Sequence, residues 1–184
     1  ILEDGGSISQ ETRLFDAREE SRGPAKKSRP AELVALIDEL RSAPPEFVSS
    51  QLVRVAELLV KDDKAWQREL LEEAFQIARQ AKVPFKLTVP RGELLGPRQL
   101  INEINALEMD RLSLQCRALQ SLVEVDRPRA LALVTELEPL QIPVTDCAEP
   151  YAPNVDAFYQ MLLAIARQGF TSKEQAKNLD LDFV

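Results

Sequence analysis

Prolines divide this chain into amphipathic segments and constrain its fold more than any other feature. A proline inside an α-helix removes a backbone hydrogen bond and clashes with the preceding turn, whereas the first turn tolerates it. Four prolines open runs rich in leucine, alanine, glutamate and arginine: Pro30, Pro45, Pro97 and Pro128. Each of these four therefore predicts the start of a helix.

Apolar residues recur along these runs at three- and four-residue spacing, the periodicity of an amphipathic helix. The chain has only six glycines and 5% aromatic residues, so its core must be mainly Leu, Val, Ile and Ala. We predict an all-α fold of about six or seven helices, stacked as antiparallel or right-angled hairpins in a short irregular solenoid or bundle. The expected helices cover residues 30–41, 45–60, 61–81, 97–125, 127–137 and 152–168, followed by a short one after Thr171.

Capping side chains mark several of these boundaries, because an N-cap accepts a hydrogen bond from the first turn. Thr171 and Glu174 have the spacing of a capping box, in which each side chain bonds the backbone of the other. In the longest helix, 97–125, Arg111 interrupts the apolar stripe, and we expect it to reach solvent or pair with an acid. The other expected caps are Ser42 or Ala43, Asp62 or Asp63, and Asp126.

The domain organisation follows from composition. Residues 1–29 hold few apolar side chains and are expected to form a tail or linker with at most a short helix at 8–20. The helical domain is expected over 30–184. Within it, the prolines and glycines of residues 83–97 predict an extended strap across the helices or, alternatively, a functional edge.

An internal sequence similarity suggests two related helical units. The segment RPAELVALIDEL (29–40) matches RPRALALVTEL (127–137) closely if one residue is skipped, and each precedes a proline-opened helix. We predict related units at 30–81 and 127–180. Chance similarity between Leu- and Ala-rich helices is the alternative.

These segments also carry a resemblance. APPEF (43–47), WQRELLEEAF (66–75), RALQSLVEVDRPRALALVTEL (117–137) and NVDAFYQML (154–162) together resemble uncharacterised, exported all-helical bacterial proteins. More loosely, the chain is similar to tetratricopeptide-like and HEAT-like helical arrays, from which its helix lengths depart. The resemblance implies helix packing and interaction, and it assigns no catalytic residue.

The absence of histidine excludes Ser–His–Asp and Cys–His catalysis and every His-ligated metal site. No phosphate-binding loop, dinucleotide fingerprint or serine-nucleophile motif occurs in the sequence. Glu69, Glu72 and Glu73 share one expected helix and are read as solvated surface charge. We therefore expect no enzyme activity and no cofactor.

Net charge and hydropathy limit the kinds of partner that we expect. A net charge of −7 disfavours nucleic acid, whose phosphates bind basic surfaces. The apolar runs are a handful of residues long, far short of the ~20 that span a bilayer. We expect neither nucleic-acid binding nor a membrane-spanning segment.

Cys116 and Cys147 form one disulfide if the protein is exported, or stay as two buried thiols, and the sequence favours neither. The chain begins with Ile1 rather than Met, which is compatible with a processed start. A periplasmic or extracellular location is therefore one expectation, and the compartment stays open.

The loop TDCAEPYAPNVD (145–156) holds the densest group of polar side chains. Its carboxylates suit a Ca²⁺ ion in type, but their spacing matches no EF-hand and no glycine provides the sharp turn. We favour an ordered loop held by Cys147 and Tyr151 over a metal site. The candidate residues of the loop are Asp146, Glu149, Tyr151 and Asp156.

The expected function is that of a non-catalytic helical interaction or scaffolding module whose partner is another protein. Two alternatives stay open: a structural fragment of a larger protein with its activity elsewhere, and a helical domain that binds lipid or a small molecule. An interaction module predicts an exposed apolar surface rimmed by polar groups, whereas a lipid-binding domain predicts a deep apolar pocket. The sequence gives no oligomeric state.

Overall fold

The structure is a computed structural model that describes residues 29–59, 63–81, 96–140 and 153–178. The chain divides into two compact units, Ile1–Pro30 and Ala31–Val184, and the fold described below is that of the second. The expected helix at 8–20 and most of the strap expected at 83–97 lie outside the described residues.

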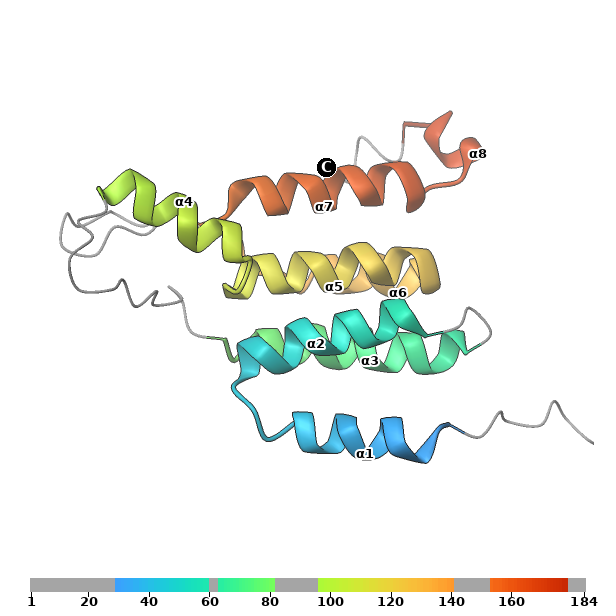
Figure 1. Ribbon diagram of the computed structural model, residues 1–184. Helices are drawn as coiled ribbons and strands as arrows, with labels where there is room; N and C mark the ends of the chain where they lie inside the picture. The colour runs from blue at the N-terminus through green and yellow to red at the C-terminus, as the bar shows by residue number, and fades with distance from the viewer. Residues whose placement is uncertain (1–28, 60–62, 82–95, 141–152, 179–184) are drawn as a thin grey trace, which may run out of the picture. The chain divides into compact units, whose positions relative to one another are not determined.

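The described residues form seven α-helices and one single helical turn, with no β-strand among them. The all-α prediction is confirmed. Pro45, Pro97 and Pro128 stand in the first turns of their helices, and Pro30 directly precedes the first helix. The elements are α1 (Ala31–Leu40), α2 (Pro45–Leu58), α3 (Lys64–Ala78), α4 (Pro97–Leu107), α5 (Arg111–Val125), α6 (Arg127–Val134), α7 (Val155–Gln168) and the turn α8 (Ser172–Gln175) (Figure 1).

Helices α2 and α3 form an antiparallel hairpin. Near the start of α2, the Oγ of Ser49 donates a hydrogen bond of 2.9 Å to the backbone oxygen of Ala74, near the end of α3. Near the start of α3, the Nε2 of Gln67 donates bonds of 3.0 Å to the backbone oxygens of Ala56 and Leu59. Both side chains are buried. These bonds satisfy their polar groups inside the core and fix the register of the hairpin.

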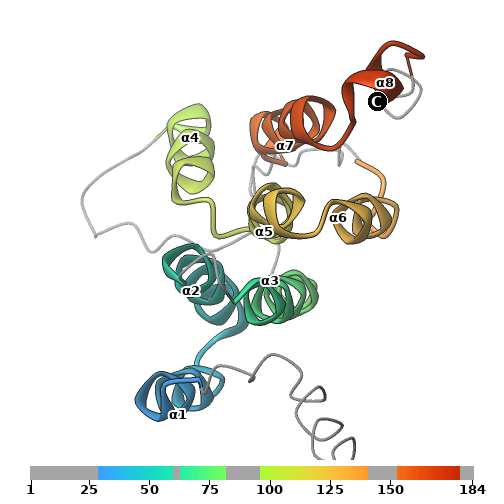
Figure 2. The same ribbon diagram turned by 90° about the vertical axis from the view of Figure 1, so that its right-hand side faces the viewer.

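Helix α5 is the central element and packs against α2, α3, α6 and α7 (Figure 2). Leu114 at its start packs with Ala78 and Ala81 at the end of α3. Arg68 at the start of α3 pairs with Asp126, just after α5, at 3.2 Å. Helices α3 and α5 are therefore antiparallel.

Aliphatic side chains fill the core around α5, as the composition predicted. Eight residues of α5 are buried, more than in any other described helix. Close packing of this kind makes every methylene count toward stability. The largest fully buried side chains include Phe75, Leu52, Leu70, Leu71, Leu114, Leu119, Leu122, Leu133, Met161 and Ile165.

Helix α1 contributes little buried surface to the core. Ile37 is its one buried residue, and Leu36 is 59% exposed. The guanidinium of Arg41, just after α1, bonds both carboxylate oxygens of Glu73 on α3, at 2.6 and 2.8 Å. The helices with close backbone packing do not include α1. The close hairpin in this region is formed by α2 and α3.

The single helix expected at 97–125 is wrong: the structure has two helices, α4 and α5. Glu108 ends α4 with a left-handed backbone (φ 50°). Asp110 then begins α5 by accepting a hydrogen bond of 3.0 Å from the backbone N–H of Ser113. Arg111 is the first residue of α5 and pairs with Glu138 at 3.0 Å. The interruption of the apolar stripe thus marks a change of helix, with the arginine paired to an acid as expected.

Most of the expected caps are confirmed. Asp63 accepts from the backbone N–H of Trp66, and Asp126 from that of Arg129. Thr171 heads the capping box predicted from its sequence spacing. The cap expected at Ser42 or Ala43 is wrong, because the N-cap of α2 is Pro44, and Ser42 instead donates to the backbone oxygen of Glu39 in α1.

Candidate functional site

A buried polar network joins the C-terminal end of α4 to the first turns of α5 and α7. The Nδ2 of Asn154 donates to the Oγ of Ser113 at 2.9 Å and to the backbone oxygen of Asn105 at 3.3 Å. Ser113 in turn donates to a carboxylate oxygen of Asp110. Asp110, Ser113 and Asn154 are 2%, 1% and 7% exposed. The bonds among Asp110, Ser113 and Asn154 join buried groups, and the bond to Asn105 is partly buried. The network therefore fixes how the three helices meet.

Helices α5 and α7 run in the same direction. Their first turns are joined by the bond between Asn154 and Ser113. At their other ends, the guanidinium of Arg127, just after α5, lies 5.8 Å from the ring centre of Phe170, just after α7. Helix α4 lies beside this parallel pair (Figure 2), and residues of the three helices line a channel between them.

This channel is an open groove of about 780 Å³. Its size falls within the range of ligand-binding clefts. The residues lining it come from α4 and its end, α5, and α7 with its cap: Asn102, Asn105, Ala106, Glu108, Ser113, Cys116, Arg117, Gln120, Asn154, Asp156, Ala157, Gln160, Leu163, Ala164, Arg167 and Gln168.

Carboxamide side chains dominate the polar lining. Apart from Asn154, which is used in the buried network, five line the groove, and none makes a side-chain hydrogen bond within the described residues. Each carries one acceptor and two donor hydrogens. They come from all three helices: Asn102, Asn105, Gln120, Gln160 and Gln168.

Two arginines and two carboxylates complete the polar lining. Six arginines elsewhere in the described chain form ion pairs with acidic side chains, whereas Arg117 and Arg167 form none there. Glu108 and Asp156 also have no ion-pair partner among the described residues. All four charges are thus available to a bound group.

Cys116 lies at the floor of the groove and is only 1% exposed. Burial, and secondarily the charge of Asp110, raises the pKa of its thiol to about 12. The thiol is therefore protonated at neutral pH, and a protonated thiol is a poor nucleophile.

An apolar strip runs along α7 beside the groove. Val155, Tyr159 and Leu163 follow one another at four-residue spacing and are 37%, 57% and 47% exposed. Leu163 also lines the groove. The rings of Phe158 and Tyr159 meet edge to face at 5.8 Å, which steadies the middle of the strip.

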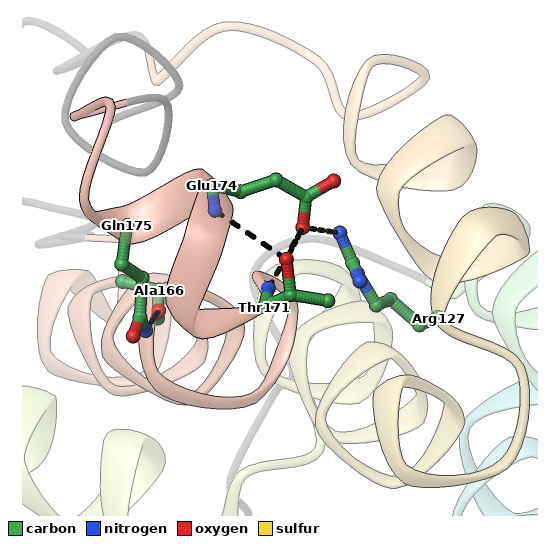
Figure 3. Close-up of polar contacts among 5 residues, drawn as sticks. All are labelled: Arg127, Ala166, Thr171, Glu174 and Gln175. Atoms are coloured by element: carbon green, nitrogen blue, oxygen red, sulfur yellow. Dashed lines mark hydrogen bonds and ion pairs between the residues drawn. The ribbon is translucent and has the colours of Figure 1, made fainter.

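A second polar cluster holds the turn α8 against α6 and α7 (Figure 3). The carboxylate of Glu174 accepts from the backbone N–H and the hydroxyl of Thr171, each at 2.7 Å, and pairs with Arg127 at 2.5 Å. The Nε2 of Gln175 donates to the backbone oxygen of Ala166 at 3.2 Å. These intramolecular contacts hold the turn in place.

The structure describes only part of the candidate loop. Asp146, Glu149, Tyr151 and Cys147 lie outside the described residues, so the loop site and the disulfide stay predictions. Asp156 is exposed in the first turn of α7 and lines the groove. Cys116 is a free, buried cysteine. In the described ranges, no group of three or more acidic or cysteine side chains has the geometry to hold a metal ion.

The acidic cluster on α3 takes part in ion pairs on the surface. Glu72 pairs with Arg68 and Arg129, and Glu73 with Arg41. These contacts agree with the prediction that this cluster is surface charge. The groove itself was missed at the sequence level, although the unusual run of Asn and Gln at 99–105, 115–120 and 160–168 was a usable signal.

Comparison with models of protein families, with curated proteins and with solved structures finds no match for this chain. Within the described ranges, every helix is too short or too polar to cross a membrane.

Proposed function

We propose that this protein is a non-catalytic helical interaction module that binds an extended segment of another protein in the groove between α4, α5 and α7. The observation that carries the proposal is the set of carboxamides along the groove that make no side-chain hydrogen bond to any described residue. A carboxamide has the same donor and acceptor groups as a peptide unit, and so it can bond both the N–H and the C=O of one peptide group.

The spacing of these groups supports a peptide ligand. Gln160 and Gln168 are eight residues apart on α7, which is about 12 Å along the helix axis. Asp156 and Arg167 are eleven residues apart, about 16 Å. An extended chain rises about 3.3 Å per residue, so this stretch of α7 matches about five residues of ligand.

The character of the lining supports binding over the alternatives. Carboxamides are neither acids nor bases at neutral pH, and the thiol of Cys116 is held protonated. The lining is mostly polar, whereas a lipid site calls for a mostly apolar cavity. The apolar strip of Val155, Tyr159 and Leu163 offers adjoining surface for one or two apolar side chains of the partner.

Selection of peptides tests the proposal. The full chain is immobilised and used to select binders from a random-peptide display library, and dissociation constants are then measured by fluorescence anisotropy. The double variant Gln120→Ala/Gln160→Ala removes two bonding groups, worth about 2 kcal/mol, and is expected to weaken the selected peptides about thirty-fold. The matched control is Gln80→Ala/Gln99→Ala, which changes two exposed glutamines that do not line the groove.

The control variant is expected to bind like the unaltered protein. The proposal is wrong if the library yields no binder, or if the groove variant binds the selected peptides as tightly as the control does. Circular dichroism of both variants verifies that the helices are intact.

A further inference from the structure

The charges of the groove are ordered along its length. Glu108 and Asp156 stand where α4 ends and α7 begins, beside the buried network of Asn154 and Ser113. Arg167 stands in the last turn of α7, at the opposite end. Arg117 projects from the middle of α5, one turn beyond Ser113. One end of the groove is therefore acidic, and the groove becomes basic toward the other.

Ion pairs neutralise most other arginines of the described chain, although Arg54 and Arg98, which lie outside the groove, also have no ion-pair partner among the described residues. The chain carries a net charge of −7, and the other arginines on α3, α6 and their flanks are neutralised by acidic neighbours. Arg117 and Arg167 keep their full donor capacity within the described chain. A guanidinium with free donors binds a carboxylate through two parallel hydrogen bonds.

We infer that the segment bound in the groove is a charge-ordered peptide, with a lysine or arginine at the Glu108–Asp156 end and an aspartate or glutamate at the Arg167 end, four to six residues apart. The inference rests on the proposed function. The spacing follows from the separation of about 16 Å between Asp156 and Arg167 along α7, divided by the rise of an extended chain.

In this inference the groove recognises charges on the side chains of the bound peptide. Either backbone direction satisfies the two ends, because a side chain of each sign is all that the ends require. The carboxamides between them bond the backbone whichever way it runs, since each offers donors and an acceptor. Charge order, rather than a particular sequence, is the specificity that the groove can impose.

Parallel peptide selections on charge variants test this inference. The random-peptide library is selected on the unaltered full chain, on Arg167→Glu, on Asp156→Lys and on the control Arg54→Glu, which alters an exposed arginine of α2 far along the chain from the groove. We expect binders of the unaltered protein and of the control to be enriched in opposite charges four to six residues apart. Binders of Arg167→Glu are expected to carry two basic residues. Binders of Asp156→Lys are expected to lose the preference for a basic residue, because the introduced lysine and Glu108 offset each other at that end.

Affinity measurements then follow the same logic. A peptide of mixed charge is expected to lose about fivefold in affinity when Arg167 is replaced by glutamine, and a similar factor with Asp156→Asn. These neutral variants serve if a charge reversal disturbs the first or last turn of α7. Both losses are expected to shrink in 1 M NaCl, which screens exposed charges.

The possible outcomes distinguish failure of the charge-order inference from failure of the proposed peptide binding. If all four proteins select peptides of the same charge pattern while Gln120→Ala/Gln160→Ala still weakens binding, the groove binds peptides and the charge-ordered inference is wrong. If no selected peptide depends on the carboxamides, the proposed function and the inference fall together.

Discussion

The Nδ2 of Asn154 donates a hydrogen bond of 2.9 Å to the Oγ of Ser113, although 41 residues separate the two in sequence. The same Asn154 caps α7 by accepting from the backbone N–H of Ala157. One side chain therefore both starts α7 and fixes its place against α5. Because the groove lies between these helices, its shape depends on this buried contact.

Replacing Asn154 with alanine is predicted to destabilise the fold by about 2–3 kcal/mol. The substitution removes a helix cap and leaves Ser113 without the amide that donates to it, and a buried group that loses its partner keeps its desolvation cost. Urea denaturation of the full chain measures the loss. The exposed substitution Gln99→Ala is the control, with an expected effect below about 0.5 kcal/mol. Equal stability of the two variants would contradict the role assigned to Asn154.

Leu119→Ala is predicted to cost about 2–5 kcal/mol, because it leaves a cavity at the centre of α5. Leu119 is fully buried in the main apolar cluster. The matched control is Leu163→Ala on α7, where the leucine is 47% exposed and has much less surface removed from water than Leu119. Thermal and urea unfolding are expected to separate the two by about 1–3 kcal/mol. A similar loss in both variants would mean that α5 is not the centre of the core.

The helix starts could be predicted from the sequence because their causes are local. Pro45, Pro97 and Pro128 act through their own rings, and Asp63 and Asp126 bond backbone groups only three residues away. The break between α4 and α5 is equally local, since Asp110 caps α5 through Ser113. It was missed because the apolar periodicity continues on both sides of the break and imitates one long helix.

The groove could not be predicted, because it depends on contacts between distant segments. Asn105, Ser113 and Asn154 meet only after α7 has returned to lie parallel to α5, and no periodicity encodes that direction. Likewise, the sequence shows that Arg117 and Arg167 are cations, but it does not show that both line one channel with no ion-pair partner among the described residues. The partners of a side chain are a property of packing.

Arg41→Ala is predicted to loosen α1 and to leave the rest of the fold nearly unchanged. Arg41 bonds both oxygens of Glu73, yet its side chain is 43% exposed, and exposed ion pairs contribute less than about 1 kcal/mol. Amide hydrogen exchange is expected to speed up in Ala31–Leu40 and to stay constant in α5. The control Arg54→Ala, an exposed arginine of α2, should leave α1 unchanged. Faster exchange throughout the chain would show that the pair supports the whole fold.

Alkaline pH is predicted to destabilise the protein through Cys116. Burial raises the pKa of this thiol to about 12, so between its ordinary pKa and that value the unfolded chain releases a proton that the folded chain retains. The thiol's contribution to stability is therefore complete below about pH 8.5 and declines as the pH rises, by up to about 1.4 kcal/mol per pH unit. Urea unfolding of the protein and of Cys116→Ala between pH 8 and 10.5 measures it as a difference in slope. Parallel slopes would contradict the prediction, as would rapid alkylation of Cys116 in the native protein by iodoacetamide.

Acid is predicted to release the turn α8 only at very low pH. The hydrogen bonds that Glu174 accepts from the backbone N–H and the hydroxyl of Thr171, together with Arg127, lower the pKa of this carboxyl to about 2 (Figure 3). The folded form thus favours the charged carboxylate, and the stabilisation that it contributes is present above the ordinary glutamate pKa and is lost as the pH falls through about 2. The carboxyl carbon shift of Glu174, followed by NMR from pH 6 downward, is expected to titrate at that low value and to rise toward the ordinary range in Arg127→Ala. A midpoint near 4.5 in the unaltered protein would mean that the capping box and the arginine do not hold Glu174 in solution.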